Sequence, residues 1–239
     1  MTIGLIWFMI ESNKEGKPKT SWRKEGRVKK IFILFLTGFF LLTLVGNLAG
    51  MTVGLKAGFN LSSLKVSPAM PDLPQFKNRS SFSGGIFVSF DFGPFSIEPE
   101  ILYAPYGTKF DLIIDDLPYR AQYQIDYLEG LLLLRWRVVR IGSVTPVIMA
   151  GPSFGFLTRA KAVLKPAAGG SGESVNMKDM YKKSEIGLSL GAGIEAKVKK
   201  LKLSLEARYH LGLTNIATSS FEGNSIKSKG ISVLAGLGF

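Results

Sequence analysis

The sequence contains no cysteine, and this absence removes several kinds of chemistry. Disulfide bridges, thiolate metal sites and a cysteine nucleophile are all excluded. Long apolar runs are also scarce, because only residues 31–50 form an uncharged stretch long enough for a membrane helix. No glycine-rich phosphate loop, metal-ligand cluster or coiled coil is present, so the sequence predicts no cofactor and no metal.

Acidic residues are few relative to basic ones, and the net charge is +12. The excess is not gathered in a basic helix or an arginine-rich stripe, so nucleic acid is not an expected partner. A basic excess spread over strands and turns better fits a surface that faces anionic lipid head groups or polyanionic sugars.

The first fifty residues have the features of an export signal. The basic residues Arg27, Lys29 and Lys30 precede the apolar stretch 31–45, and mostly small residues follow at 46–50. This order predicts a secretory signal peptide cleaved near Ala49 or Gly50; an uncleaved anchor helix is the alternative. Residues 1–27 make a long leader, which suggests a misassigned start and translation from Val28. We therefore expect a leader and signal peptide at 1–50 and a separate domain at 51–239.

From Met51 onward apolar and polar residues alternate with the period of a β-strand. In Leu201–Thr214, leucine, alanine and tyrosine occupy one face, while charged and small polar residues occupy the other. This strand exceeds the roughly 9–11 residues that a tilted membrane strand needs. The same reading identifies eight strands, near residues 51–61, 82–92, 95–107, 119–138, 144–158, 184–198, 201–214 and 228–239.

Folding residues 82–106 into a hairpin at Gly93-Pro94 places apolar pairs on one face and mostly polar pairs on the other. Phe92 then meets Phe95, and Phe87 meets Glu100, with apolar and polar pairs on opposite faces. In a true hairpin, a single turn position gives this separation on both faces at once. In the strand at 119–138 the run of four leucines hides the register, and Glu129-Gly130 is a candidate bulge.

The predicted connections alternate in length. Those at 93–94, 139–143 and 199–200 are short. Those at 62–81, 108–118, 159–183 and 215–227 are long and polar, or rich in Gly and Pro. Short turns at one end and long loops at the other are typical of an outer-membrane barrel. The fold class is therefore all-β: an eight-stranded antiparallel up-and-down barrel in the outer membrane of a Gram-negative-type bacterium, with outer-membrane lipid around it. A soluble lipocalin-like barrel, with its faces reversed, is the alternative.

Several stretches resemble the PorT-type outer-membrane β-barrel family. They are Val53-Gly-Leu-Lys-Ala-Gly-Phe-Asn-Leu61, Ile97-Glu-Pro-Glu-Ile-Leu-Tyr103, Tyr127-Leu-Glu-Gly-Leu-Leu-Leu-Leu134, Ser189-Leu-Gly-Ala-Gly-Ile-Glu195 and the final Phe239. The resemblance implies an eight-stranded barrel inserted by the barrel-assembly machinery, which reads a terminal aromatic, here Phe239. Some members assist protein secretion, but most have no assigned task.

Charged residues on the inward face suggest a structural network in the lumen. Buried charges must be paired, and the inward positions supply both signs. The predicted lumen residues are Lys56, Glu98, Glu100, Glu195, Lys202, Glu206, Arg208 and His210. Two catalytic alternatives remain: a carboxylate pair at Glu98 and Glu100, or a triad formed across strands around His210.

Three functions follow from these observations. The favoured one is a structural or interaction barrel that is not an enzyme, with a filled lumen and surface loops that bind a periplasmic or cell-surface protein. A narrow pore for small solutes is the second, although eight strands leave an interior that side chains just fill. A lipid-modifying barrel enzyme is the third.

Overall fold

The computed structural model describes residues 51–67, 77–114, 116–169, 172–218 and 225–239, without the side chain of Ile114. The predicted signal peptide, its cleavage site and the proposed start at Val28 lie outside these residues. Within the described ranges, no helix combines the length and hydropathy needed to span a membrane.

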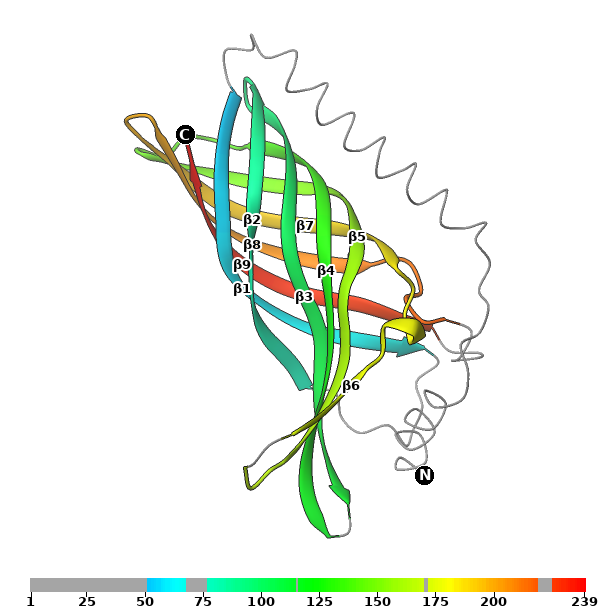
Figure 1. Ribbon diagram of the computed structural model, residues 1–239. Coiled ribbons are helices and arrows are strands. Elements are labelled where there is room, and N and C mark those ends of the chain that lie inside the picture. Colours follow the sequence, from blue (N-terminus) through cyan, green and yellow to red (C-terminus); the bar gives the residue numbers. More distant parts are fainter. Residues whose placement is uncertain (1–50, 68–76, 115, 170–171, 219–224) are drawn as a thin grey trace. The chain divides into compact units, whose positions relative to one another are not determined.

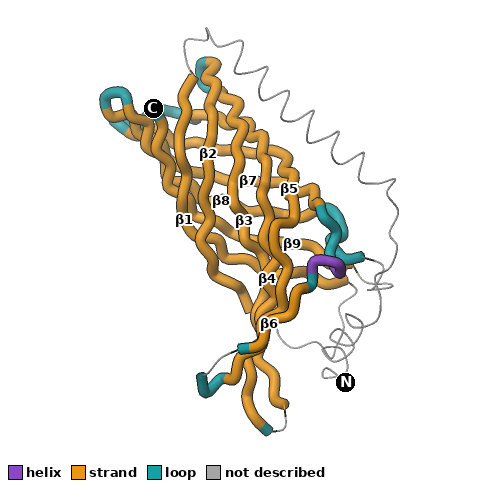
Figure 2. Tube along the Cα trace, viewed as in Figure 1, coloured by secondary structure: helices purple, strands orange, loops and turns teal. Residues whose placement is uncertain are grey.

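Long antiparallel strands close into a ring (Figures 1 and 2). The strand order is β4-β3-β2-β1-β9-β8-β7-β5, and β5 also pairs with β4, which closes an eight-stranded barrel as the sequence predicted. A short additional strand, β6, pairs with β5 alone. The elements are β1 Met51–Ser67, β2 Lys77–Phe92, β3 Phe95–Ile114, β4 Leu117–Arg137, β5 Val144–Pro166, β6 Glu173–Asn176, the 3-10 helix η1 Lys178–Met180, β7 Ser184–Val198, β8 Leu201–Gly212 and β9 Ser225–Gly238.

The predicted hairpin register is confirmed. Phe92 faces Phe95 and Phe87 faces Glu100 across the β2–β3 turn, where Gly93 has a φ of 61°. The terminal strands meet, because β9 pairs antiparallel with both β8 and β1. This closure leaves no edge in the ring, which a barrel in hydrocarbon requires because lipid offers the backbone no hydrogen bonds.

The two faces of the barrel are reversed relative to a soluble protein. On β8, Leu205 and Ala207 point outward and are exposed, whereas Glu206 and Arg208 point inward and are buried. The other strands follow the same alternation over most of their length, although Val88 and Phe90 of β2 are also buried, and the exposed outer band is aliphatic and aromatic. Such a band is stable only where lipid covers it, so the soluble-barrel alternative is wrong.

Some predicted loops are wrong, because the strands continue through them. Within residues 108–118, β3 and β4 stay paired as far as Ile114 and Leu117, and β5 continues to Pro166 with β6 beside it. Strands β1 and β2 likewise extend into 62–81. The prediction missed these extensions because their apolar residues alternate over only a few positions, among many charged residues and close to Pro118 and Pro166.

The predicted bulge at Glu129-Gly130 is also wrong. Both residues pair regularly with β3 and β5. The register instead shifts at Thr158, which is the extra residue opposite Asp126 and Tyr127.

Beyond the ring, β3 to β6 form a four-stranded arm, visible at the bottom of Figure 1. We define the arm as residues 109–114, 117–122, 159–166 and 173–176. Lys77, at the start of β2, donates to Asp111 at 2.6 Å, and this hydrogen bond, with help from Arg120, holds the pKa of Asp111 below its ordinary value.

Candidate functional site

The lumen is filled by a network of ion pairs. Lys56 Nζ on β1 lies 2.6 Å from Glu98, 2.5 Å from Glu100 and 3.1 Å from Glu206. All four side chains are almost fully buried. Their proximity follows from the barrel, since β1, β3 and β8 each direct alternate residues into one narrow interior.

Arg208 adds a two-pronged contact to this group. Its Nη1 and Nη2 lie 2.6 and 2.7 Å from the two carboxylate oxygens of Glu100, and its guanidinium also contacts Glu206. Arg–carboxylate forks of this kind fix geometry as well as charge.

Sequence reasoning missed three members of the network, Asp91, Arg135 and Arg137, and Arg135 is the most buried of them. It is 1% exposed and contacts Glu98, Glu195 at 2.5 Å and Glu206 at 2.7 Å. The leucine run before it hides the strand register. Counting by two from the inward residue Glu129 reaches Arg135, and that signal was available in the sequence.

Toward the end with the short turns, the network opens into a cavity of about 500 Å³. Arg137 and Lys202 line it and pair there with Asp91 and Glu195. The connected network thus contains five basic and five acidic side chains: Lys56, Arg135, Arg137, Lys202 and Arg208, with Asp91, Glu98, Glu100, Glu195 and Glu206.

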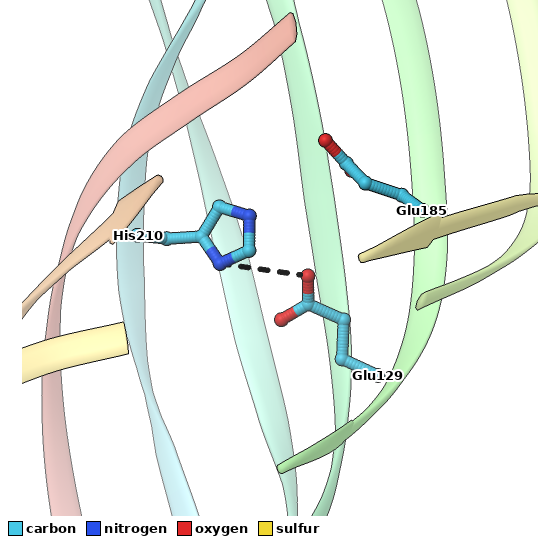
Figure 3. Close-up of side chains that lie close together, drawn as sticks. All are labelled: Glu129, Glu185 and His210. Carbon is cyan, nitrogen blue, oxygen red and sulfur yellow. Dashed lines mark ion pairs between the residues drawn. The ribbon is translucent and has the colours of Figure 1, made fainter. Parts of the chain in front are cut away.

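His210 lies apart from this network, among two other carboxylates (Figure 3). Its Nδ1 is 3.8 Å from Glu129 Oε1, and its Nε2 is 3.3 Å from Ser228 Oγ. Ser228 donates to Glu185 Oε1 at 2.5 Å, and Tyr106 donates to Glu129 Oε1 at 3.1 Å. The sequence placed His210 in the lumen but did not bring it together with Glu129 and Glu185.

Gly212 makes room for this second group. A Cβ at position 212 would lie 2.1 Å from Glu185 Oε1 and 2.9 Å from the carbonyl oxygen of Ser228. Because the backbone cannot yield easily, a side chain there would displace the Glu185 carboxylate.

The two catalytic arrangements considered from the sequence can now be compared with the geometry. Glu98 and Glu100 are both held by cations, so they do not resemble an acid/base pair. Ser228, His210 and Glu129 form a Ser–His–Glu series, but the Ser228 hydroxyl donates to Glu185 rather than to the imidazole. Ser228 is also 1% exposed, on the inside of the barrel, away from lipid.

Phe239 ends the chain at the barrel seam. Its backbone pairs with Val53 of β1, with its N–H donating to the Val53 carbonyl at 2.8 Å, while its side chain is 65% exposed.

The ring of strands is closed, its outer band is apolar and its interior is charged. These three features define an integral outer-membrane β-barrel. The model of the family described as outer membrane protein beta-barrel domain matches residues 48–218, and the chain belongs to this family. The protein therefore resides in the outer membrane.

Solved structures with a similar fold include Neisserial surface protein A, Ail and the outer membrane enzyme PagL. Neisserial surface protein A is 15% identical, with 80% of this chain and 98% of that chain covered and a TM-score of 0.43. Ail, the attachment invasion locus protein of Yersinia pestis, is 16% identical, with 80% and 99% covered and a TM-score of 0.41. The outer membrane enzyme PagL is 11% identical, with 76% and 97% covered and a TM-score of 0.34. No curated protein matches the chain.

Proposed function

We propose that this protein is a closed outer-membrane barrel with a structural or interaction role. The observation that carries the proposal is the ion network across the lumen, in which Lys56, Glu98, Arg135 and Glu206 are each no more than 2% exposed. A solute would have to separate these pairs in a low-dielectric interior, and breaking a buried ion pair costs about 3–5 kcal/mol. This cost disfavours the narrow pore.

The arm supplies the interaction surface in this proposal. It continues past the ring at the end opposite the short turns, and its tip carries Ile113 and Leu117, which are 70% and 58% exposed. Exposed large apolar side chains beside charged ones are typical of protein contact sites. A cell-surface protein is the partner that this placement favours; a periplasmic protein would have to bind the opposite mouth.

Two finer assignments support the same proposal. The motifs at 53–61 and 97–103 suggest a PorT-type member, and a terminal Phe239 at the seam suits recognition by the barrel-assembly machinery. We do not extend the proposal to protein secretion or to lipid hydrolysis, because the polar groups of the lumen face away from lipid.

Conductance in planar lipid bilayers tests the closed lumen. We expect the wild-type protein to show no stepwise current. A double variant, Glu98→Ala with Arg135→Ala, keeps the net charge of the network while removing two of its buried side chains, and it should conduct. Steps of similar size from the wild type and the double variant would contradict the proposal and favour the pore.

A further inference from the structure

Glu129 and Glu185 differ from the carboxylates of the lumen network because no lysine or arginine pairs with them among the described residues; their basic neighbour is His210. They are 3% and 1% exposed, yet in the described part of the chain neither forms an ion pair with a lysine or arginine. Two buried carboxylates without cations are strongly destabilising. Protons or a bound cation would neutralise these carboxylates, and the position of His210 distinguishes the two.

The hydrogen bonds determine which nitrogen of His210 carries a proton. Ser228 uses its only hydroxyl hydrogen to donate to Glu185, so its oxygen accepts from His210 Nε2. In the neutral imidazole only one nitrogen carries hydrogen. The lone pair of Nδ1 therefore faces Glu129 Oε1 at 3.8 Å, and two electron-rich atoms oppose each other.

A direct hydrogen bond does not account for this pair. N–H···O distances run about 2.7–3.2 Å, so 3.8 Å is too long for a proton shared between the two atoms. Two ligands that are each about 2.1 Å from one Zn²⁺ can lie up to about 4.2 Å apart. The observed separation suits a metal ion between the two atoms.

Several buried polar atoms in and around this group have no hydrogen-bond partner among the described residues. Within the part of the chain that the structure describes, His210 Nδ1 and Glu185 Oε2 are buried and form no hydrogen bond, and the hydroxyls of Tyr127 and Ser153 also have no partner. Buried polar atoms in native proteins are almost always satisfied, and each that is not costs about 1–3 kcal/mol. The unsatisfied atoms of this group include an imidazole nitrogen and a carboxylate oxygen, which are both ligands that divalent transition metals bind.

We propose that Glu129, Glu185 and His210 together bind one divalent transition-metal ion inside the barrel. They come from β4, β7 and β8 and offer one ligand atom each, all within 4.8 Å of one another (Figure 3), so small side-chain rotations bring the three atoms to one ion. One imidazole and two carboxylates suit Zn²⁺ and similar ions. The two carboxylates neutralise the ion, and Ser228 and Tyr106 orient the ligands through hydrogen bonds, as outer-shell partners do in known metal sites.

The site is enclosed, so the ion enters as the barrel folds. The segments next to it, at 177–183 and 213–218, pair through the Tyr181–Ala217 bridge, and Met177, Tyr181 and Ile216 are buried. Metal present during folding is therefore incorporated, whereas metal added to a folded apo-barrel binds slowly.

The direct test uses the full-length gene product extracted from outer membranes in detergent. The protein is unfolded in urea with a chelator, then refolded with or without Zn²⁺, and bound metal is measured after gel filtration. We expect one Zn²⁺ per chain and a higher unfolding temperature in the metal-loaded sample. Refolding with Co²⁺ should give a visible spectrum of nitrogen and oxygen ligation.

Three variants test the ligand set: Glu129→Gln, Glu185→Gln and His210→Gln should each weaken Zn²⁺ binding by about tenfold or more. Asp91→Asn removes one carboxylate at the opposite mouth and is the matched control, which should retain one Zn²⁺. Absence of stoichiometric Zn²⁺ or Co²⁺ in the folded wild type would overturn the proposal, as would equal binding by the three variants and the control. If the variants do not fold, the metal content and Co²⁺ spectrum of the wild type still decide the question.

The conductance experiment is independent of this one, so either proposal can fail without the other.

Discussion

At the scale of single residues, Arg135 is the centre of the lumen network. It touches three carboxylates from β3, β7 and β8 and is the largest of the fully buried side chains. Its guanidinium cannot lose its proton in a protein, so it stays a cation at any pH at which the barrel is folded. The surrounding carboxylates therefore depend on it for neutralisation.

We expect Arg135→Met to lower the free energy of unfolding by about 3–5 kcal/mol, because it leaves buried carboxylates without their cation. Urea titrations in lipid vesicles measure the loss. The control Arg140→Met removes an exposed guanidinium that only contacts the carbonyl of Gly142, and it should change stability by less than about 0.5 kcal/mol. Adding Glu98→Gln to Arg135→Met should recover part of the loss. An Arg135 variant as stable as the wild type would show that the network is not held by this residue.

At the scale of the element, strand β8 has one face for lipid and one for the lumen. Ala207 lies near its middle, points outward and pairs with Ala192 and Val233 of the neighbouring strands. The two flanking inward residues, Glu206 and Arg208, belong to the network. A one-residue slip of the register would exchange these faces, so the register is strongly specified.

Ala207→Arg should cost about 2–4 kcal/mol of folding stability, because it places a charge against lipid near the bilayer midplane. Ala207→Leu, which enlarges the same position without charge, is the control and should have little effect. Folding titrations in vesicles compare the two. Equal stability of the Arg and Leu variants would mean that this face of β8 does not meet lipid.

At the scale of the whole molecule, the even number of strands returns both ends of the barrel domain to the side of the short turns. The arm then lies on the opposite side of the membrane from the β7–β8 turn. We infer that the arm is at the cell surface and the short turns are periplasmic, following the general plan of such barrels.

The absence of cysteine makes this orientation measurable, since any introduced thiol is the only one in the chain. Asp111→Cys, in the arm, should react with a membrane-impermeant maleimide on intact cells. Lys200→Cys, in the β7–β8 turn, is the matched control and should react only after the outer membrane is permeabilised. The opposite labelling pattern would invert the orientation and place the arm in the periplasm.

Much of the fold was predictable from local patterns. Alternation along residues 201–214 set both the strand and its faces, and the single fold point at Gly93-Pro94 gave the correct hairpin register. The prediction failed where alternation stops being informative. The arm was predicted to be a loop because its apolar and charged residues alternate over only a few positions, next to Pro118 and Pro166. Arg135 was missed because four leucines before it conceal the period.

The sequence by itself determined the strands, their inward and outward faces and the closed barrel in a membrane, because these follow from a period of two along each strand and from the need to pair every backbone amide. Only the tertiary structure decided which inward residues meet. Contacts across the lumen depend on the stagger accumulated around all eight strands, which no single strand encodes. That stagger brings Arg135 to three carboxylates. It places His210 of β8 beside Glu185 of β7 and also beside Glu129 of β4, which is far from both in the chain.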